Sequence, residues 1–521
     1  MKKRIIALLV TGCMLLASLS GCSSKTTETD QSEPEQSGST ETSAPAVTEA
    51  ASGYDFSDRD FTTLKVLMFG DSTSDQAKAV SEALSKITKE KLNCDVDITF
   101  VGFGSYATQL NLMLSSGEQL DLFSPFTLGA GTLANAGQIL PMDDLLATYG
   151  KDTLNAVSQE DWQCAKINGQ IFGVPCNKDK AYNLSFTMRK DVLDELGVSV
   201  DSLTSFDDLH DLLEKVKEAH PEMYPVISNY GGTFSYLPVD SLGGGDAVLL
   251  DPYNSDSLKV ENFIASDYFK NLCETMYSWA KEGLIMPDAS TNSEGYSSLI
   301  GSGKGFGYFI HTKQKDSGYN SGATSENGTD MESWIYKEAI SVTNAVALVW
   351  SVPTTSVDPD RAMALLDLMY NDPEVSNLCI YGVEGVHYQV IDKDNGIIDY
   401  PEGVTASTVG YTSSVAWGWP NEQIAYIWNG NSATAWKDLN SFNASAKQSP
   451  AKGFTFDNSS VINEATACNN VDSKYYNALL GGQLDPEVAI PKYLQELKDN
   501  GIDTIIAEKQ KQLDAWAESN K

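Results

Sequence analysis

The sequence predicts an α/β protein with parallel-rich sheets flanked by helices, on the basis of three observations. Residues 64–69 form an almost continuous apolar run that ends at a glycine, which is typical of a strand buried on both faces. Residues 95–103 alternate between polar and apolar side chains, which favours a second strand. Helix-like segments separate these runs, and a strand–helix–strand order is that of a parallel sheet with helices on its faces.

The first elements can be placed in order along the chain. Asp71, Ser72 and Thr73 are residue types that cap helices, and the segment after them repeats apolar residues near helical spacing at Val80, Leu84, Ile87 and Leu92. Residues 106–115 again have a helical pattern that ends near Gly117. Residues 120–123 are predicted as a short third strand.

Further elements are predicted along the rest of the chain. Residues 388–400 are predicted as a hairpin that turns at Asp394–Asn395–Gly396. Asp358–Pro359 has the sequence of a helix N-cap followed by a first-turn proline. Helices are predicted at residues 191–196, 206–219, most of 259–283, 361–370, 491–500 and 502–516.

Composition excludes several classes of protein. The 521 residues include 36 basic and 71 acidic side chains, for a formal net charge of −35. Nucleic acid and anionic lipid surfaces are bound by clustered Lys and Arg, so neither is an expected partner. Hydrophobic residues make up 41% of the chain, which excludes disorder over its full length. This length predicts about two to four domains.

The N-terminus predicts export. Three basic residues precede an apolar run at 5–19, which has the length of a signal-peptide core and is too short for a membrane span. Leu19–Ser20–Gly21–Cys22 resembles a bacterial lipobox, so residues 1–22 are predicted as a lipoprotein signal peptide and Cys22 as the lipidated residue. The alternative is an ordinary secretory signal with a chance cysteine. Residues 23–60 are predicted as a disordered polar tether, because Ser, Thr and Glu dominate most of this stretch.

Six cysteines follow Cys22, and none forms a C-x-x-C pair. Cys164 and Cys176 are close in sequence, so an extracellular disulfide between them is possible. Buried free thiols are the favoured interpretation for the set.

One edge of the predicted parallel sheet is a candidate ligand site. In open α/β sheets, ligands bind beyond the carboxyl ends of the strands. Asp71 and Ser72 follow the first strand, and Phe126 follows the third, so we expect these three side chains near a ligand. The alternative for Asp71 is a helix cap without a ligand.

Several motifs in order give the chain a family resemblance over most of 62–516. The lipobox, the tether, and the early Gly70–Asp71–Ser72 and 111–118 segments are followed by 171–175 (IFGVP), 188–193 (MRKDVL), 206–209 (FDDL) and 358–363 (DPDRAM). This order resembles extracellular solute-binding proteins of bacterial ABC importers, the broad family related to maltose-binding protein. Residues 381–388 (YGVEGVHY) and 505–516 (IIAEKQKQLDAW) resemble a subfamily with a C-terminal region of uncharacterised function (DUF3502-like).

The resemblance implies a two-lobed periplasmic-binding-protein-like fold (type II) with a hinge of two or three crossovers. Residues 61–176 plus 342–384 are assigned to the N-terminal lobe, and 177–341 plus 385–521 to the C-terminal lobe. The ligand would lie in the cleft between them. Asn177, Lys178 and Tyr230 are expected near this cleft. Glu384 falls where the third crossover should be, and either contacts the ligand or locks the hinge.

Aromatic residues gather late in the chain and favour a carbohydrate ligand. Four of the nine tryptophans lie between 417 and 436. Aromatic rings cover the C–H faces of sugars, while amides and carboxylates bind their hydroxyl groups. Trp417 and Trp419 are the strongest candidates, because Gly418 and Pro420 indicate an irregular loop. Pro420 departs from the pattern of the relatives. Core packing is the alternative for each tryptophan.

Motifs for catalysis, cofactors and metals are missing from the sequence. None of the four histidines is paired at i, i+4, and no nucleophile elbow occurs. Gly301–Gly305 lacks the spacing of a phosphate loop and is interpreted as a turn. Asp392, Asp394 and Asn395 resemble a calcium loop, but a hairpin turn is favoured. We therefore expect no cofactor, no metal and no enzymatic activity.

We interpret the chain as a lipid-anchored protein on the extracytoplasmic face of the cell membrane. It would capture a small solute, a carbohydrate or oligosaccharide, as a monomer, and deliver it to the permease subunits of an ABC importer. The membrane contact would be the lipid anchor alone. One alternative is a peptide- or amino-compound-binding protein of the same fold. Another is a cell-surface glycoside hydrolase, because 71 acidic residues leave a pair of catalytic carboxylates possible.

Overall fold

The computed structural model describes residues 54–519, apart from 168, 230, 235, 314–322, 325–326, 344–347 and 412–413. The predicted signal peptide, Cys22 and most of the predicted tether lie outside the described residues, and so does Tyr230. Among the helices within this part of the chain, none is long and apolar enough to cross a membrane.

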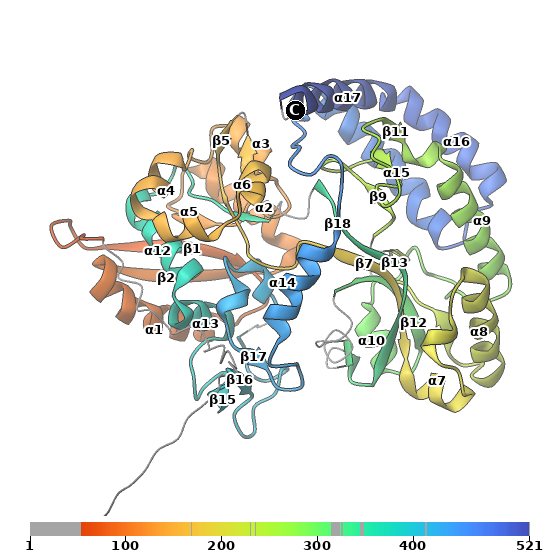
Figure 1. The fold of residues 1–521 in the computed structure, drawn as a ribbon, viewed down its shortest axis with the longest axis horizontal. Coiled ribbons are helices and arrows are strands. Elements are labelled where there is room, and N and C mark those ends of the chain that lie inside the picture. The colour runs from red at the N-terminus through yellow and green to blue at the C-terminus, as the bar shows by residue number, and fades with distance from the viewer. Residues whose placement is uncertain are drawn as a thin grey trace, which may run out of the picture. The chain divides into compact units, whose positions relative to one another are not determined.

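The first sheet confirms the predicted parallel start. Strands β1 (Thr62–Phe69), β2 (Cys94–Val101) and β3 (Leu122–Phe123) lie in the order β2-β1-β3, and both pairings are parallel. Helices α1 (Ser74–Leu92) and α2 (Phe103–Ser116) connect them (Figure 1). Two serines of α1 accept hydrogen bonds of 2.9 Å from backbone amides of β2, Ser85 from Val96 and Ser81 from Ile98. The helix therefore fixes the edge strand through side chains as well as apolar packing.

The first hydrophobic core surrounds this sheet and contains residues from Phe56 to Cys176 and from Trp350 to Ala425. Arg361 is buried in this part of the protein, where it bonds Asp358 across 3.0 Å. The remaining helices around the core are α3 (Ala130–Asn135), α4 (Asp143–Tyr149), α5 (Lys151–Ala156), α6 (Gln159–Ala165), α12 (Pro359–Asn371) and α13 (Pro373–Tyr381). Its short strands are β4 (Lys166–Ile167), β5 (Gln170–Ile171), β6 (Val174–Pro175) and β14 (Val349–Trp350).

A second core is built on a mixed five-stranded sheet. In spatial order its strands are β18 (Lys447–Gln448), β13 (Met331–Ser341), β7 (Tyr182–Arg189), β12 (Gly305–Thr312) and β8 (Tyr224–Val226). The helices α7 (Lys190–Leu196), α8 (Phe206–Ala219), α9 (Asp267–Lys281) and α10 (Tyr296–Gly301) belong to the same part of the fold. A small antiparallel sheet contains β9 (Val239–Asp240), β10 (Ala247–Leu250) and β11 (Val260–Asn262).

The C-terminal part of the chain is helical. Helices α15 (Ile462–Leu480), α16 (Pro486–Asp499) and α17 (Ile502–Ser519) pack on one another, and α15 and α16 also pack on α9 (Figure 1). The predicted start of the first of two closing helices at Pro491 was wrong, because Pro491 lies inside α16. The side chain of Asp485 caps this helix by accepting a 3.0 Å hydrogen bond from the amide of Glu487.

The predicted hairpin is confirmed as β15 (Gln389–Asp392) and β16 (Ile397–Asp399), and β17 (Ile427–Trp428) pairs with β16. The carboxylate of Asp392 accepts hydrogen bonds from the backbone amides of Asp394 and Asn395, at 3.1 and 3.2 Å. This carboxylate therefore stabilises the turn.

Over the part of the chain that the structure describes, three passages connect the two cores. The chain first leaves β6 for β7 and then returns from β13 to β14, and the third passage runs from β17 through α14 (Ala435–Ser445) to β18. Glu384 is not at the third passage, because Tyr381 and Tyr388 on either side of it both pack in the first core. Tyr411 and Trp419 belong to that core as well. The expected crossover at Glu384 was wrong because hydrophobic packing continues beyond it.

Candidate functional site

Four aromatic rings meet beyond the carboxyl ends of the three parallel strands. Phe69 ends β1, Phe103 begins α2 just after β2, Phe126 follows β3, and Trp417 lies on the 3-10 turn Ala416–Gly418. The Phe69 ring centre is 4.6 Å from that of Phe126, 5.2 Å from that of Trp417 and 5.3 Å from that of Phe103. We call these four residues the first aromatic group.

The first aromatic group offers ring surface to a ligand. Phe69 is buried, Phe126 and Trp417 are partly buried, and Phe103 is 42% exposed. The rings of Phe103 and Trp417 are nearly parallel, at 16° with centres 6.3 Å apart. Large exposed aromatic rings cost free energy in water unless something covers them, so this group is suited to an apolar face of a ligand.

Gly418 allows the tryptophan turn to approach the end of β1. A Cβ atom at this position would overlap the ring of Phe69, so a larger residue would push the turn away. The carbonyl of Gly418 accepts a 2.8 Å hydrogen bond from Nε1 of the buried Trp350. The turn that carries Trp417 is thus held by packing on one side and by a buried hydrogen bond on the other.

Three charged residues lie beside the first aromatic group. Nζ of Lys178 is 6.0 Å from the centre of the Trp417 ring and 2.9 Å from Oδ1 of Asp179. Nζ of Lys313 is 3.1 Å from the same oxygen. Burial acts to raise the pKa of Asp179, but the ammonium groups of Lys313 and Lys178 hold it well below its usual range. We call Lys178, Asp179 and Lys313 the ion trio.

A second aromatic group, Tyr182, Tyr236 and His311, lies near Asp179 on the side of the second core. The Tyr236 ring centre is 4.4 Å from that of His311 and 4.6 Å from that of Tyr182. Asp179 acts electrostatically on both Tyr236 and His311. Burial lowers the pKa of His311 to about 4, so its imidazole is neutral at neutral pH. The ion trio therefore has two aromatic groups as neighbours, one in the first core and one that includes Tyr182 of β7 and His311 of β12 in the five-stranded sheet.

Glu422 adds a buried carboxyl group next to the ion trio. It is 5% exposed, and Oε1 has no hydrogen-bond partner among the described residues. Burial raises its pKa, an effect that Lys313 and Lys178 oppose and Asp179 reinforces. A carboxyl group with a free acceptor atom beside two lysines can bind a hydroxyl or amide donor.

Comparison with known proteins assigns the fold to a family. The family model described as bacterial extracellular solute-binding protein matches residues 70–375. The chain belongs to this family. A domain of unknown function (DUF3502) matches residues 450–518 of this solute-binding protein. Both findings confirm the resemblance seen in the sequence.

One relative is similar over most of both chains. The solute-binding protein is 25% identical over 476 residues to a carbohydrate ABC transporter substrate-binding protein of Streptococcus pneumoniae serotype 4 (strain ATCC BAA-334 / TIGR4). The match covers 88% of this chain and 91% of the relative.

Solved structures confirm the two-lobed α/β fold class. The crystal structure of the N-glycan transport solute binding protein NgtS from Streptococcus pneumoniae has a TM-score of 0.79 at 24% identity, and covers 88% of this chain and 100% of its own. The same protein in complex with Man5GlcNAc has a TM-score of 0.73 at 24% identity, over 88% and 99% of the two chains. An extracellular solute-binding protein from Bifidobacterium longum subsp. infantis has a TM-score of 0.60 at 16% identity, over 87% and 98%.

The predicted residues after β1 and β3 lie at the described edge of the sheet. Phe126 belongs to the first aromatic group. Asp71 is exposed, and its carboxylate lies so close to Gly102 that a Cβ there would be 2.9 Å from Oδ1. The helix-cap alternative for Asp71 was wrong, because the N-cap of α1 is Thr73. Ser72 is partly buried in the same loop.

The structure separates the two predicted tryptophans. Trp417 is partly buried in the first aromatic group, whereas Trp419 is 1% exposed and stacks on Trp350, with ring centres 5.5 Å apart at 15°. Trp419 is therefore a core residue in this structure, at odds with the expected ligand contact. The two indoles diverge because a 3-10 turn, and not a strand, carries them.

The remaining predicted residues lie elsewhere or form structural contacts. Asn177 bonds the side chain of Asn421 in the first crossover. Glu384 is exposed on a turn closed by a 2.7 Å hydrogen bond from the amide of Gly385 to the carbonyl of Tyr388. Within the described residues, no ring contact or hydrogen bond joins Glu384 to either aromatic group. Tyr230 falls outside the described part.

Sequence reasoning missed several residues of the site: Phe69, Phe103, Lys313, Tyr236, His311 and Glu422. A signal existed only for Phe103, which follows the second strand as Asp71 follows the first. It was missed because the predicted strand extended through it. The others come together through packing between segments that are distant in sequence.

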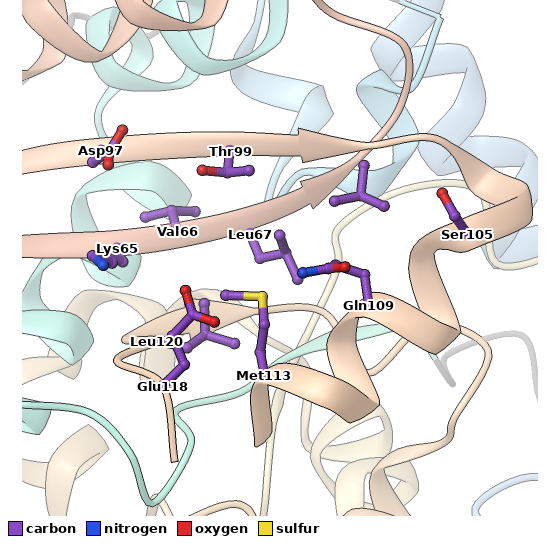
Figure 2. A pocket seen from close by; sticks show the side chains of 11 residues that line it. Lys65, Val66, Leu67, Asp97, Thr99, Ser105, Gln109, Met113, Glu118 and Leu120 are labelled. Carbon is purple, nitrogen blue, oxygen red and sulfur yellow. The ribbon is translucent and has the colours of Figure 1, made fainter. Parts of the chain in front are cut away.

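A separate hollow lies on the first sheet and lacks these features. Its volume is about 240 Å³, and Leu67 of β1 together with Gln109 and Met113 of α2 forms its centre. Figure 2 shows both α2 side chains directed toward Leu67, with Lys65 and Asp97 farther along the strands. No aromatic residue lines it, so it does not share the chemistry of the two aromatic groups.

Proposed function

We propose that this solute-binding protein captures an oligosaccharide for an ABC importer. The observation that carries the proposal is the first aromatic group, in which the exposed ring of Phe103 and the partly buried rings of Phe126 and Trp417 lie beyond the carboxyl ends of β1, β2 and β3. The ion trio and Glu422 supply polar groups beside these rings. The chain's similarity to a carbohydrate substrate-binding protein and to an N-glycan transport protein supports a sugar as the ligand.

Sugars match this combination of groups. The C–H faces of a pyranose gain about 25 cal/mol per Å² of apolar area covered by an aromatic ring. Each net hydrogen bond adds about 0.5–1.5 kcal/mol, and a hydroxyl left without a partner costs more than that. Two or three rings together with several polar contacts account for micromolar binding, which corresponds to about −8 kcal/mol.

Closure around the sugar follows from the two cores and the three crossovers. A ligand that contacts the first aromatic group and Tyr236 gains contacts from both cores only when the lobes close on it. We assign residues 54–176 and 349–428 to the first lobe and 182–341 and 447–519 to the second, following the membership of the two cores. This moves the predicted 385–428 segment to the first lobe.

The remaining parts of the proposal concern the cell. The lipobox sequence supports lipidation at Cys22 on the extracytoplasmic face of the membrane. The protein would act as a monomer, without catalysis, and would deliver its sugar to permease subunits. Metabolic labelling with palmitate in a bacterial host, with Cys22→Ala as the control, tests the anchor.

Two variants and one control test the site. Phe103→Ala and Trp417→Ala remove exposed ring surface, and Phe61→Ala removes a phenylalanine that is 53% exposed just before β1. Calorimetry is carried out with N-glycan fragments, maltooligosaccharides and basic peptides. We expect a sugar to bind the wild type, with at least tenfold weaker binding to the first two variants and unchanged binding to Phe61→Ala.

Other results would replace the proposal. Binding of peptides alone would favour the peptide-binding alternative, and shortening of a bound oligosaccharide, seen by chromatography, would favour a hydrolase. Sugar binding that both aromatic variants leave unchanged would reject the first aromatic group as the site.

A further inference from the structure

The loop between β9 and β10 has an unusual backbone. Leu242, Gly243, Gly244 and Gly245 have φ values of 50°, 96°, 124° and 73°. Glycine adopts such values easily, but a leucine in this region is strained. A loop of this kind keeps one conformation only when surrounding groups hold it.

Lys509 of α17 holds this loop from the C-terminal region. Its ammonium group donates hydrogen bonds to the carbonyls of Ser241, Gly244 and Ala247, at 2.9, 2.8 and 2.8 Å. All three ammonium donors are thereby used, and the side chain is fully buried. Burial lowers the pKa of Lys509 to about 8, while Asp240 and Asp246 act to raise it. A buried cation placed on three carbonyls of one loop fixes the path of that loop.

A second contact joins the same loop to α15 and α16. The hydroxyl of Tyr493 donates a 2.7 Å hydrogen bond to Oδ1 of Asp472. Asp472 faces Asp246, which is the residue after the glycines. Burial, together with the neighbouring carboxyl of Asp472, raises the pKa of Asp246 well above its usual range, and burial also raises the pKa of Asp472.

The loop forms one wall of a cavity of about 240 Å³. Tyr182 and Tyr236 of the second aromatic group line this cavity, together with Gly245 and Asp246 of the loop and Tyr476 of α15. Its volume is below the roughly 300–1,000 Å³ of sites for drug-sized ligands. Tyrosine rings and a carboxyl group are suited to one sugar ring.

The loop is also connected to a crossover. Asp240, the last residue of β9, accepts a 3.0 Å hydrogen bond from the amide of Thr343, and the two side chains bond as well. Thr343 follows β13 in the second passage between the cores. A shift of this loop would therefore change both the wall of the cavity and the contact with the crossover.

We propose that the C-terminal region, residues 450–518, builds one wall of the ligand site. Lys509 is a positioning residue that fixes the loop of residues 241–247, and the cavity behind Tyr236 takes one ring of the oligosaccharide. The assignment of the cavity rests on the proposed function. The role of Lys509 in holding the loop does not.

Two matched lysine variants test the positioning role. Lys509→Met keeps most of the side-chain length and removes the charge, and Lys511→Met makes the same change at a lysine of α17 that is 74% exposed. Hydrogen exchange without ligand is expected to accelerate at least tenfold for the amides of residues 241–247 in Lys509→Met and to stay unchanged in Lys511→Met. Unchanged exchange in Lys509→Met would overturn the positioning role.

Calorimetry with N-glycan fragments of increasing length tests the cavity. Lys509→Met is expected to bind the longest fragment at least tenfold more weakly, with a smaller loss for the shortest. Tyr476→Trp, which fills the cavity and leaves the Lys509 contacts in place, is expected to give the same loss with unchanged loop exchange. Wild-type affinity in both variants would overturn the cavity assignment while sugar binding itself stands. A wild type that binds no sugar would overturn the proposed function, and the exchange experiment still decides the role of Lys509.

Discussion

Asn177 and Asn421 are joined by a 3.0 Å hydrogen bond between their side chains, although 244 positions separate them in the sequence. The backbone amide of Asn177 donates a second hydrogen bond, of 2.8 Å, to the carbonyl of Pro420. Pro420 and Asn421 directly follow the turn that carries Trp417. The first crossover and the tryptophan turn are therefore fixed to each other, so the position of Trp417 depends on the hinge.

Replacing Asn421 should destabilise the protein. Its side chain accepts the bond from Asn177 and donates a 2.8 Å bond to the carbonyl of Tyr370, and the residue is 5% exposed. Asn421→Ala leaves buried polar groups without partners, so we expect a loss of about 1–3 kcal/mol in the free energy of unfolding, measured in urea. Asn429→Ala, at an exposed asparagine, is the control. Equal urea midpoints for the two variants would contradict the structural role of Asn421.

Replacing Asp179 should lower stability at neutral pH and have little effect in acid. The pKa of this carboxyl is depressed, so its contribution is present above the unfolded value of about 3.9 and is lost as pH falls toward the folded value. Asp179→Asn leaves Lys178 and Lys313 without their partner. We expect a loss of at most about 3 kcal/mol at pH 7, because Lys313 is 34% exposed and a buried pair costs about 3–5 kcal/mol to break.

The exposed pair of Lys190 and Asp194 provides the control for that experiment. Asp194→Asn removes a surface ion pair, with side chains 41% and 64% exposed, and should cost less than about 1 kcal/mol. Urea melts of both variants at pH 7 and at steps from about pH 4 down to about pH 2, where the contribution of a depressed carboxyl is lost, test the prediction. A deficit for Asp179→Asn that stays constant across this range would show that the carboxylate charge is not the cause.

The thiols should be free and slow to react. All six cysteines of the described residues are unpaired, so the possible disulfide between Cys164 and Cys176 is not formed in this structure. Burial raises the pKa of Cys94 to about 11 and that of Cys273 to about 12, and little thiolate exists at neutral pH. In protein that begins at Ser23, and so lacks Cys13 and Cys22, we expect a thiol reagent to label all six cysteines after unfolding without reductant. The native form should react slowly, fastest at the partly exposed Cys164. Four labelled thiols would indicate a disulfide.

The raised pKa values of Asp246 and Asp472 should make the free energy of unfolding fall as pH rises. Both pKa values are raised by burial, so the contribution is full below the unfolded value of about 3.9 and is lost as pH rises through the folded values. Lys509 and Tyr493 face the pair and oppose the shift of Asp246. Asp246→Asn supplies a permanent donor, and we expect it to flatten the decline in unfolding free energy between pH 5 and 8.

Asp256→Asn is the control for the carboxyl pair, because the Asp256 side chain is 94% exposed. Its stability profile should run parallel to that of the wild type. The decline in the wild type has an upper limit of about 1.4 kcal/mol per pH unit for each proton released. A profile of Asp246→Asn that also runs parallel would show that the two raised carboxyl pKa values are not the cause of the decline.

Local patterns predicted the first sheet and several helices well. The apolar run at 64–69 and the alternation at 95–103 became β1 and β2, and the predicted helix at 206–219 is α8 with the same ends. These elements carry strong local signals, because burial on one or both faces sets the spacing of apolar residues. The start of α16 was predicted wrongly at Pro491, because the sequence alone does not distinguish a proline in the first turn of a helix from one inside the helix.

Only those residues of the candidate site that lie next to a local sequence signal could be predicted. Phe126 was found because it follows a strand end, and Trp417 because glycine and proline marked an irregular loop. The same reasoning selected Trp419, which the structure buries against Trp350. Lys313 and His311 meet Asp179 only through the pairing of β12 with β7, and no spacing in the sequence contains that information.

The first core is built from two separate stretches of the chain, and this has a consequence for biosynthesis. A nascent chain that has emerged as far as Cys176 already contains the three parallel strands, but it lacks Trp350 and the helix at Pro359–Asn371 that help to enclose them. The second core in turn needs residues as late as Leu513. Neither half can reach its final packing during most of synthesis, so the polypeptide stays open until nearly its full length is available.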